Sequence, residues 1–261
     1  MADTGNAGRS EGWRFWAFTL FMLALMALFV ALGLWQVLRL EEKERLIAAV
    51  AARFEQPPIE LPPVAEWAAT DSEQYDFRPV TVTGTYLPEA TVLVFTSLGE
   101  ARGTHSGPGY WVMTPLRLAT GGTIFVNRGF VPQSARESFA GGGAPEAGMV
   151  SLSGVARLGE TVGGFTPAPE LGKRIDWVRN PARLATLAGR LEPPIAPLYI
   201  DLPAGPPGTL PQGGETVMSF PNNHLGYVIT WFGFAALVPP LLWFWIRRQR
   251  QVPLVAAGRS R

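Results

Sequence analysis

The sequence predicts a membrane protein in which two transmembrane helices, one near each end, flank an antiparallel, β-rich domain. Three observations support this fold class. A long charge-free stretch lies near each end of the chain, and the region between the two stretches contains several period-two patterns. Charged residues make up only 16% of the chain, against about 25% in soluble domains. We expect the β-rich domain to be α+β, with a barrel-like or strongly curved sheet.

Residues 15–38 form the first predicted transmembrane helix, after a tail of residues 1–14. Its 24 charge-free residues are enough to cross a hydrocarbon core of roughly 30 Å. Trp13, Trp16 and Trp35 lie near its ends, where tryptophan favours the headgroup layer. A cleaved signal peptide is the alternative, but the stretch is longer than a usual signal core and no small-x-small site follows directly.

Residues 225–246 form the second predicted transmembrane helix, 22 residues long and also without a charge. Tyr227, Trp231 and Trp243 suit the membrane interfaces. Pro239 and Pro240 lie inside this stretch, which membrane helices tolerate.

Positive charges beside the two spans predict the orientation. Two spans place both tails on one side, and arginines are frequent in the tails of residues 1–14 and 247–261. Positive tails favour the cytoplasm, so residues 39–224 are expected outside it, in the periplasm of a bacterial inner (plasma) membrane. A mitochondrial inner membrane is the alternative, although Asp3 and Glu11 make the tail a poor transit peptide.

Between the spans, residues 40–54 predict a helix that continues the first span and carries a favourable pair of Glu41 and Arg45. Residues 181–189 predict a short helix with Pro at its start and Gly at its end. Stretches rich in β-branched and aromatic residues predict strands at residues 78–86, 91–96, 110–118, 123–130 and 149–158. Shorter strand candidates are residues 175–178, 198–201 and 217–220.

The composition argues against several functions. The chain has no cysteine, which excludes disulfides, thiolate metal sites and cysteine nucleophiles. A net charge of +1 gives no support for nucleic acid as a partner. No nucleotide-binding, nucleophile-elbow or zinc motif occurs, so no catalytic and no metal-binding residue is predicted. A hydrolase site assembled from distant residues remains the enzyme alternative, with two histidines to build it.

Three residues are candidates for ligand contact. His105 lies in a Gly-rich loop, where an exposed histidine is the simpler interpretation. His224 directly precedes the second span, where it meets the β-rich domain. A neutral imidazole there could bind a haem iron, or it could be an interfacial residue near a helix capped by Asn222 or Asn223. Arg128 interrupts an apolar strand. Such a charge usually pairs with a carboxylate on a neighbouring strand, but it could bind a ligand propionate.

Several segments occur in an order that carries a family resemblance. They are Leu34-Trp35-Gln36 with Arg39 and Lys43, Arg78-Pro79-Val80, Gly109-Tyr110-Trp111-Val112, Asn127-Arg128-Gly129-Phe130, and Asn222-Asn223-His224-Leu225 with Tyr227, Thr230 and Trp231. In this order, between two terminal spans, they resemble the surfeit-locus-one family of cytochrome c oxidase assembly factors. The resemblance extends from about Leu32 to Ile246.

The resemblance implies a function in assembly of the haem–copper (aa3-type) oxidase, at the insertion of haem a into the catalytic subunit. Family members are not known as enzymes, and some bacterial members are thought to bind haem a, with the histidine that matches His224 as a proposed ligand. The implied partners are the catalytic subunit, the haem a synthesis machinery and the lipid bilayer. The partner-contact candidates are Trp35, Gln36, Arg39, Tyr227 and Trp231.

Two departures from the family pattern bear on these expectations. Glu42 stands where the family often has Trp before the Lys, and residues 213–217 lack the basic residue often found after the Thr. A cofactor-free, membrane-anchored interaction scaffold is the alternative function. Because the matching motifs cluster at the outer ends of both spans, we expect any ligand or subunit to be met where those ends meet the sheet.

Overall fold

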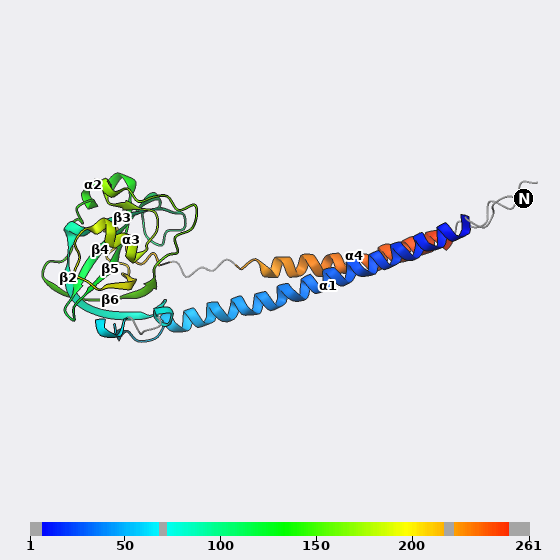
Figure 1. Cartoon of the computed structure of the whole chain (residues 1–261), viewed down its shortest axis with the longest axis horizontal. Coiled ribbons are helices and arrows are strands. Elements are labelled where there is room, and N and C mark those ends of the chain that lie inside the picture. Colours follow the sequence, from blue (N-terminus) through cyan, green and yellow to red (C-terminus); the bar gives the residue numbers. More distant parts are fainter. Residues whose placement is uncertain (1–6, 68–71, 217–221, 251–261) are drawn as a thin grey trace, which may run out of the picture. The chain divides into compact units, whose positions relative to one another are not determined.

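The computed structural model describes residues 7–67, 72–216 and 222–250, with side chains from residue 12 onward. It divides into two compact units. The first, Met1–Ala48 with Ser219–Arg261, contains the apolar parts of the two long helices, and the second, Ala49–Met218, contains the sheet. Figure 1 labels the elements used below.

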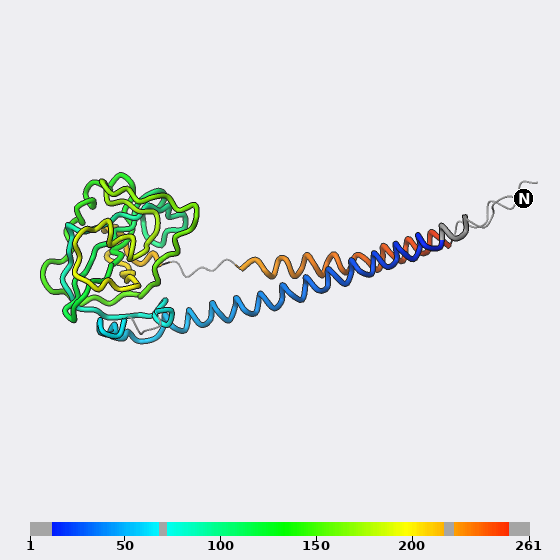
Figure 2. Tube along the Cα trace, in the orientation of Figure 1, coloured from blue at the N-terminus to red at the C-terminus, as the bar shows by residue number. Residues whose placement is uncertain are grey.

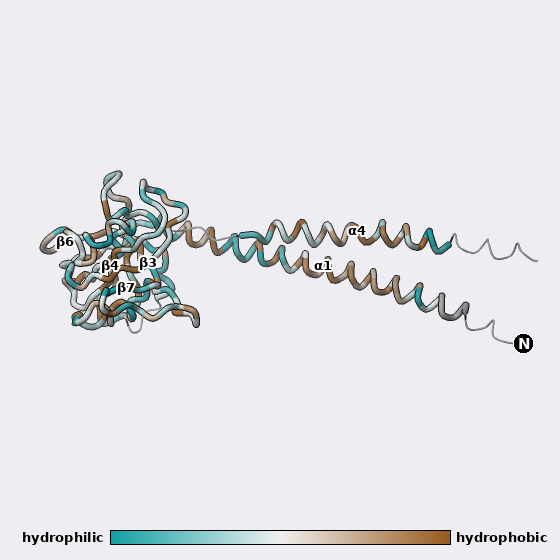
Figure 3. The backbone as a smooth tube through the Cα atoms, turned by 90° about the horizontal axis from the view of Figure 1, so that it is seen from above, coloured by the Kyte–Doolittle hydropathy of each residue, from teal (hydrophilic) through white to brown (hydrophobic). Residues whose placement is uncertain are grey.

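Two helices, α1 (Ala7–Phe54) and α4 (His224–Arg250), contain the predicted spans. Both are long and apolar enough to cross a membrane, and only 11% of the most apolar window of each is buried, unlike the core helix of a soluble protein. Figure 3 shows their apolar stretches in brown, with polar turns beyond them. The predicted helix at residues 40–54 is confirmed as a continuation of α1, in which Arg45 pairs with Glu41 at 3.3 Å.

Aromatic contacts show that α1 and α4 run antiparallel. Phe15 stacks on Trp245 with ring centroids 4.9 Å apart, and Phe29 stacks on Trp231 at 5.9 Å. Early residues of α1 therefore meet late residues of α4. Figure 2 shows these two segments, distant in the sequence, side by side.

The sheet closes into a barrel, which confirms the predicted fold class. Its closed ring contains β2 (Pro79–Tyr86), β6 (Met149–Leu158), β8 (Ile195–Asp201), β5 (Thr123–Pro132) and β4 (Gly107–Leu118). The ring closes where β4 pairs with β2, with Leu118 opposite Gly84. Beyond the ring, β3 (Val92–Leu98) and then β7 (Ile175–Asp176) extend from β4, and β1 (Ile59–Glu60) pairs with β2.

The sheet is not wholly antiparallel, contrary to the expectation from sequence. The pairs β5–β8, β1–β2 and β3–β7 are parallel. A parallel pair needs a long connection, and between β5 and β8 the chain passes through α2 (Arg136–Phe139), β6 and α3 (Pro181–Ala188). The shorter strands predicted at residues 175–178 and 198–201 correspond to β7 and β8, whereas residues 217–220 lie outside the described residues.

Apolar side chains fill the barrel from all five ring strands. Val80 and Val82 point inward from β2 while Thr81 and Thr83 do not, as the period-two pattern predicted. A second cluster lies under α3, where Leu184 covers the outer face of the sheet. The predicted helix at residues 181–189 is confirmed as α3, with the Asn180 side chain accepting from the N–H of Arg183.

Candidate functional site

His224 and Gln36 meet across the two apolar helices. The Nδ1 atom of His224, the first residue of α4, lies 2.7 Å from the Oε1 atom of Gln36 in α1. Gln36 is only 8% exposed, and His224 is half-buried. Residues 188 positions apart in the sequence are therefore brought together in one polar contact between otherwise apolar segments.

A glycine lets the helices come close beside this pair. Gly33 lies one turn before Gln36 in α1, and a Cβ atom there would be 2.9 Å from the ring of Phe232 in α4. The ring of Phe232 thus occupies the space that a side chain at position 33 would need. Small residues permit such close approach of membrane helices, and this approach brings Gln36 within reach of His224.

The acceptor identity assigns the proton on the imidazole. A glutamine Oε1 can only accept a hydrogen bond, so Nδ1 of His224 must carry the hydrogen and donate it. In a neutral imidazole the other nitrogen, Nε2, then has the free lone pair. Among the described residues no hydrogen bond to Nε2 is formed. The site therefore presents one imidazole nitrogen suited to binding a metal.

The other predicted contact residues divide into two groups. Trp231 packs on Phe29 between the helices. Trp35, Arg39 and Tyr227 have side chains that are about half exposed. The Arg39 guanidinium lies 5.9 Å from the ring centroid of Trp35 and pairs with Glu42 at 2.7 Å. The departure from the family pattern at Glu42 thus provides a counterion for Arg39.

Asn222 does not cap α4 with its side chain. Its Oδ1 atom is buried and has no hydrogen-bond partner among the described residues. The first backbone bond of α4 runs instead from the N–H of Tyr227 to the carbonyl of Asn223. A buried oxygen without a partner is costly, and this one lies two residues before His224.

Arg128 does not form the carboxylate pair expected from sequence. Its guanidinium donates to the carbonyl of Gly142 and lies 5.8 Å from the ring centroid of Tyr86. No ion pair of Arg128 occurs within residues 7–67, 72–216 and 222–250. Burial lowers the pKa of Arg128, against the opposite effect of Tyr86. Burial likewise raises the pKa of Tyr86 to about 12, although Arg128 acts to lower it.

His105 is held by its backbone rather than by its imidazole. The side-chain amide of Gln212 accepts from the N–H of His105 at 2.8 Å and donates to its carbonyl at 2.9 Å. The buried carboxylate of Glu215 accepts from the N–H groups of Arg102 and Gly103 at 2.9 and 2.8 Å. In the sequence, residues 213–217 stood out only as a departure from the family pattern. The contacts of Gln212 and Glu215 show that this part of the chain holds the loop of residues 102–105.

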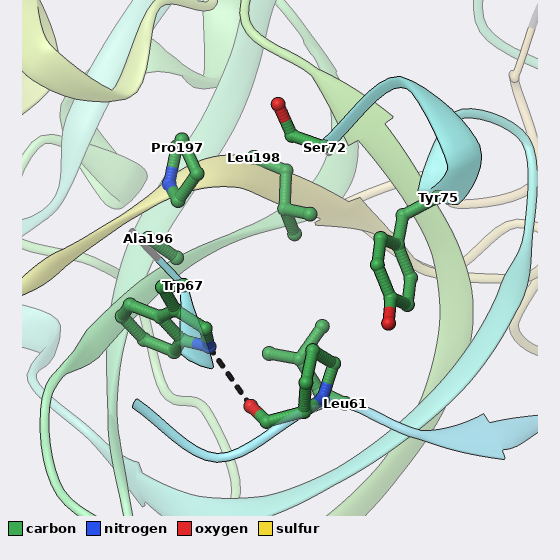
Figure 4. Close-up of a pocket in the computed structure, with 8 residues that line it drawn as sticks. Leu61, Trp67, Ser72, Tyr75, Ala196, Pro197 and Leu198 are labelled. Atoms are coloured by element: carbon green, nitrogen blue, oxygen red, sulfur yellow. Dashed lines mark hydrogen bonds between the residues drawn. The ribbon is translucent and has the colours of Figure 1, made fainter. Parts of the chain in front are cut away.

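The described residues of the barrel unit line several cavities. One of about 620 Å³ lies among the loops of residues 102–104 and 203–214 beside Phe54, and a neighbouring cleft of about 350 Å³ reaches Asp201 and Thr216. Figure 4 shows a third cavity, beside Trp67, Tyr75 and Leu198. Its volume is about 10 Å³ and its lining is almost wholly apolar, so it is a packing void of roughly the size of one water molecule.

Comparison with known proteins identifies the family. The sequence model of the SURF1 family matches residues 23–236. A SURF1-like protein of Monosiga brevicollis is 32% identical over 257 residues, which cover 95% of this chain and 93% of that protein. Surfeit locus protein 1 of Homo sapiens is 30% identical over 260 residues, covering 93% of this chain and 81% of its own. The match thus includes the barrel, His224 and Gln36, and this chain belongs to the SURF1 family.

Proposed function

We propose that this protein is a membrane-anchored, non-catalytic assembly factor of an aa3-type cytochrome c oxidase that assists the insertion of haem a into the catalytic subunit. Membership of the SURF1 family supports a role in cytochrome c oxidase assembly. The two apolar helices support anchoring in the membrane, where an apolar cofactor and a membrane-embedded subunit would both be met.

His224 is the proposed haem ligand, and its hydrogen bond to Gln36 is the observation that carries this assignment. Histidine is a common axial ligand of haem iron, and metal-binding histidines usually donate their other N–H to a neighbouring acceptor. The 2.7 Å contact from Nδ1 to Gln36 provides that acceptor. A bound haem would supply the iron; His224 would hold it through Nε2, and Gln36 would orient the imidazole.

Arg128 is a second, weaker candidate for cofactor contact. The guanidinium has five N–H donors; among the described residues it makes one hydrogen bond, to the carbonyl of Gly142, and lies over the ring of Tyr86. Donors remain for a carboxylate such as a haem propionate, and partial burial would strengthen that pair.

The exposed aromatic residues support a partner surface on the helices. Trp35 and Tyr227 are 50% and 54% exposed. With the half-exposed Arg39, we assign them to contacts with the catalytic subunit or the haem a synthesis machinery. Gln36, bonded to His224, and Trp231, packed on Phe29, would support this surface from inside the helix pair. The charge distribution of the tails supports an inner membrane location with both termini in the cytoplasm and the barrel in the periplasm.

The test of this function has a spectroscopic arm and a genetic arm. Purified from a host that makes haem a, the protein should show a Soret band, and His224→Ala should lower the bound haem at least about tenfold, a loss of about 1.4 kcal/mol. His105→Ala is the matched control, because only the backbone of His105 is bonded. Deleting the gene should lower the haem a content of the oxidase without stopping haem a synthesis.

The outcomes separate the two candidate functions. A missing Soret band, or a band that His224→Ala leaves unchanged, favours the cofactor-free scaffold if deletion still impairs the oxidase. A normal oxidase in the deletion strain would contradict both.

A further inference from the structure

We propose that Gln36 is a positioning residue that holds His224 in the Nδ1-protonated tautomer and thereby presents Nε2 as the binding atom. The identity of the metal that Nε2 would bind rests on the proposed function. The tautomer itself rests on the contact between the two side chains, so the two can fail separately.

The surroundings of Gln36 make this contact specific. Gln36 lies in the 24-residue charge-free stretch of α1 and is 8% exposed. A buried amide without a hydrogen bond is costly, and His224 is its only hydrogen-bond partner among the described residues. The energy that keeps Gln36 at this position therefore also keeps the imidazole turned with Nδ1 toward α1.

The packing beside the pair limits rotation of both groups. Gly33 and Phe232 are in contact one turn further into the helix pair, and Phe29 contacts both Trp231 and Phe234. These contacts set the spacing between α1 and α4 on that side. A flipped imidazole would place Nε2 toward Gln36 and Nδ1 away from it, and the 2.7 Å contact would then be lost or remade with the other nitrogen.

The charge of the group that accepts from Nδ1 should affect how strongly Nε2 donates electrons to a metal. Hydrogen bonding to an amide oxygen fixes the orientation of the imidazole, whereas a carboxylate in the same place would polarise the Nδ1–H bond more strongly and make Nε2 a stronger electron donor. Gln36→Glu is thus expected to keep the tautomer while changing the electron donation of the imidazole. Gln36→Leu, close in size, is expected to lose both the acceptor and the tautomer preference.

Nitrogen-15 NMR of the full chain in detergent, labelled at histidine and free of haem, tests the tautomer. Only two histidines contribute, and His105→Ala identifies the signals of His224. The wild type and Gln36→Glu should show Nδ1 protonated and Nε2 unprotonated. Gln36→Leu should shift the tautomer ratio toward Nε2–H by roughly fivefold, the ratio that one typical hydrogen bond supports.

Thr19→Val is the matched control. Thr19 is also a polar residue of the α1 span, but its hydroxyl donates to the carbonyl of Phe15 in the same helix. A merely structural loss of one hydrogen bond in α1 would affect both variants alike, whereas only Gln36→Leu should change the His224 signals.

Haemin binding to the same variants separates this inference from the proposed function. If His224 is the ligand, Gln36→Glu should lower the reduction potential of bound haemin and Gln36→Leu should raise it, with Thr19→Val unchanged. If Gln36→Leu changes the tautomer but His224→Ala leaves haemin binding unchanged, His224 is not the haem ligand, and the positioning role of Gln36 still holds.

The positioning role would be overturned by an Nε2–H tautomer in the wild type, or by a Gln36→Leu variant whose His224 signals do not change. If Gln36→Leu does not fold, loss of the Nδ1–H tautomer in Gln36→Glu would overturn that role as well.

Discussion

At the level of single residues, the carboxylate of Asp201 shows how much of the barrel depends on one buried charge. It is 3% exposed and accepts from the Asn127 amide at 2.8 Å and the Thr216 hydroxyl at 3.0 Å. The guanidinium groups of Arg157 and Arg179 lie 3.7 and 3.9 Å away. Nothing in the sequence distinguishes this residue among 21 acidic residues, because its partners come from distant segments.

Replacing Asp201 should therefore cost far more than replacing an exposed carboxylate. Asp201→Ala leaves two buried cations with less compensation, a change that typically costs about 3–5 kcal/mol. Glu192→Ala is the control: Glu192 pairs with Arg117 at 3.7 Å, and both side chains are about half exposed, so its loss should cost about 0–1 kcal/mol. Thermal unfolding of the purified variants followed by circular dichroism measures the difference; equal shifts would contradict the role of Asp201.

In the candidate site, too, the sequence identified residues but not the contacts that they make. His224 could be singled out from sequence because the chain has only two histidines and one of them directly precedes a predicted span. Gln36 was predicted as a partner contact, but its hydrogen bond to His224 depends on how α1 and α4 pack. The carboxylate usually expected beside a charge such as Arg128 is not found among the described residues, where the backbone carbonyl of Gly142 accepts from the guanidinium instead.

At the level of elements, the five longest predicted strands are all present within a few residues of their expected bounds. Alternation of side chains is a local property, so period two identifies a strand wherever one face is buried. Strand direction is not local. The parallel pairing of β5 with β8 depends on the path of the chain between them, and the residue pattern within either strand does not predict this pairing.

Gly129 offers a test of how β5 is joined to the chain beyond the barrel. Its φ is +128°, and a Cβ atom there would be 2.4 Å from backbone atoms of Gln212. The N–H groups of Phe130 and Gln212 each donate to the other's carbonyl at 2.8 Å. Gly129→Ala should therefore break this bridge and lower the free energy of unfolding by about 2 kcal/mol or more.

Gly99→Ala is the matched control, because a Cβ atom at Gly99 meets nothing within 4 Å. Its unfolding midpoint in denaturant should stay close to that of the wild type, within about 0.5 kcal/mol. A Gly129→Ala midpoint equal to that of Gly99→Ala would show that the bridge contributes little.

At the level of the whole molecule, the chain combines a helix pair and a closed barrel as separate units. The positive tails beyond both apolar helices predict that the termini share one side of the membrane and that the barrel lies on the other. Two spans of opposite direction agree with this arrangement, because α1 and α4 run antiparallel.

Single cysteines test the orientation without background, since the chain has none of its own. Phe165 is fully exposed in the barrel unit, and Ser10 precedes the first predicted span, in the predicted tail of residues 1–14. In spheroplasts, a membrane-impermeant maleimide should label Phe165→Cys nearly completely and should label Ser10→Cys only after permeabilisation. Labelling in the opposite order would reverse the orientation, and labelling of both without permeabilisation would contradict two spans.

The sequence by itself determined the two apolar helices, the strand positions, the short helix α3 and the family. The length of an apolar stretch, the alternation of side chains and the order of motifs are all properties of consecutive residues. Only the tertiary structure decided the closure of β4 onto β2, the parallel pairing of β5 with β8, the environment of Arg128, and the contact between Gln36 and His224. Each of these joins residues that are distant in sequence or depends on packing around a side chain. Such contacts depend on how whole elements pack, which a pattern of neighbouring residues does not predict.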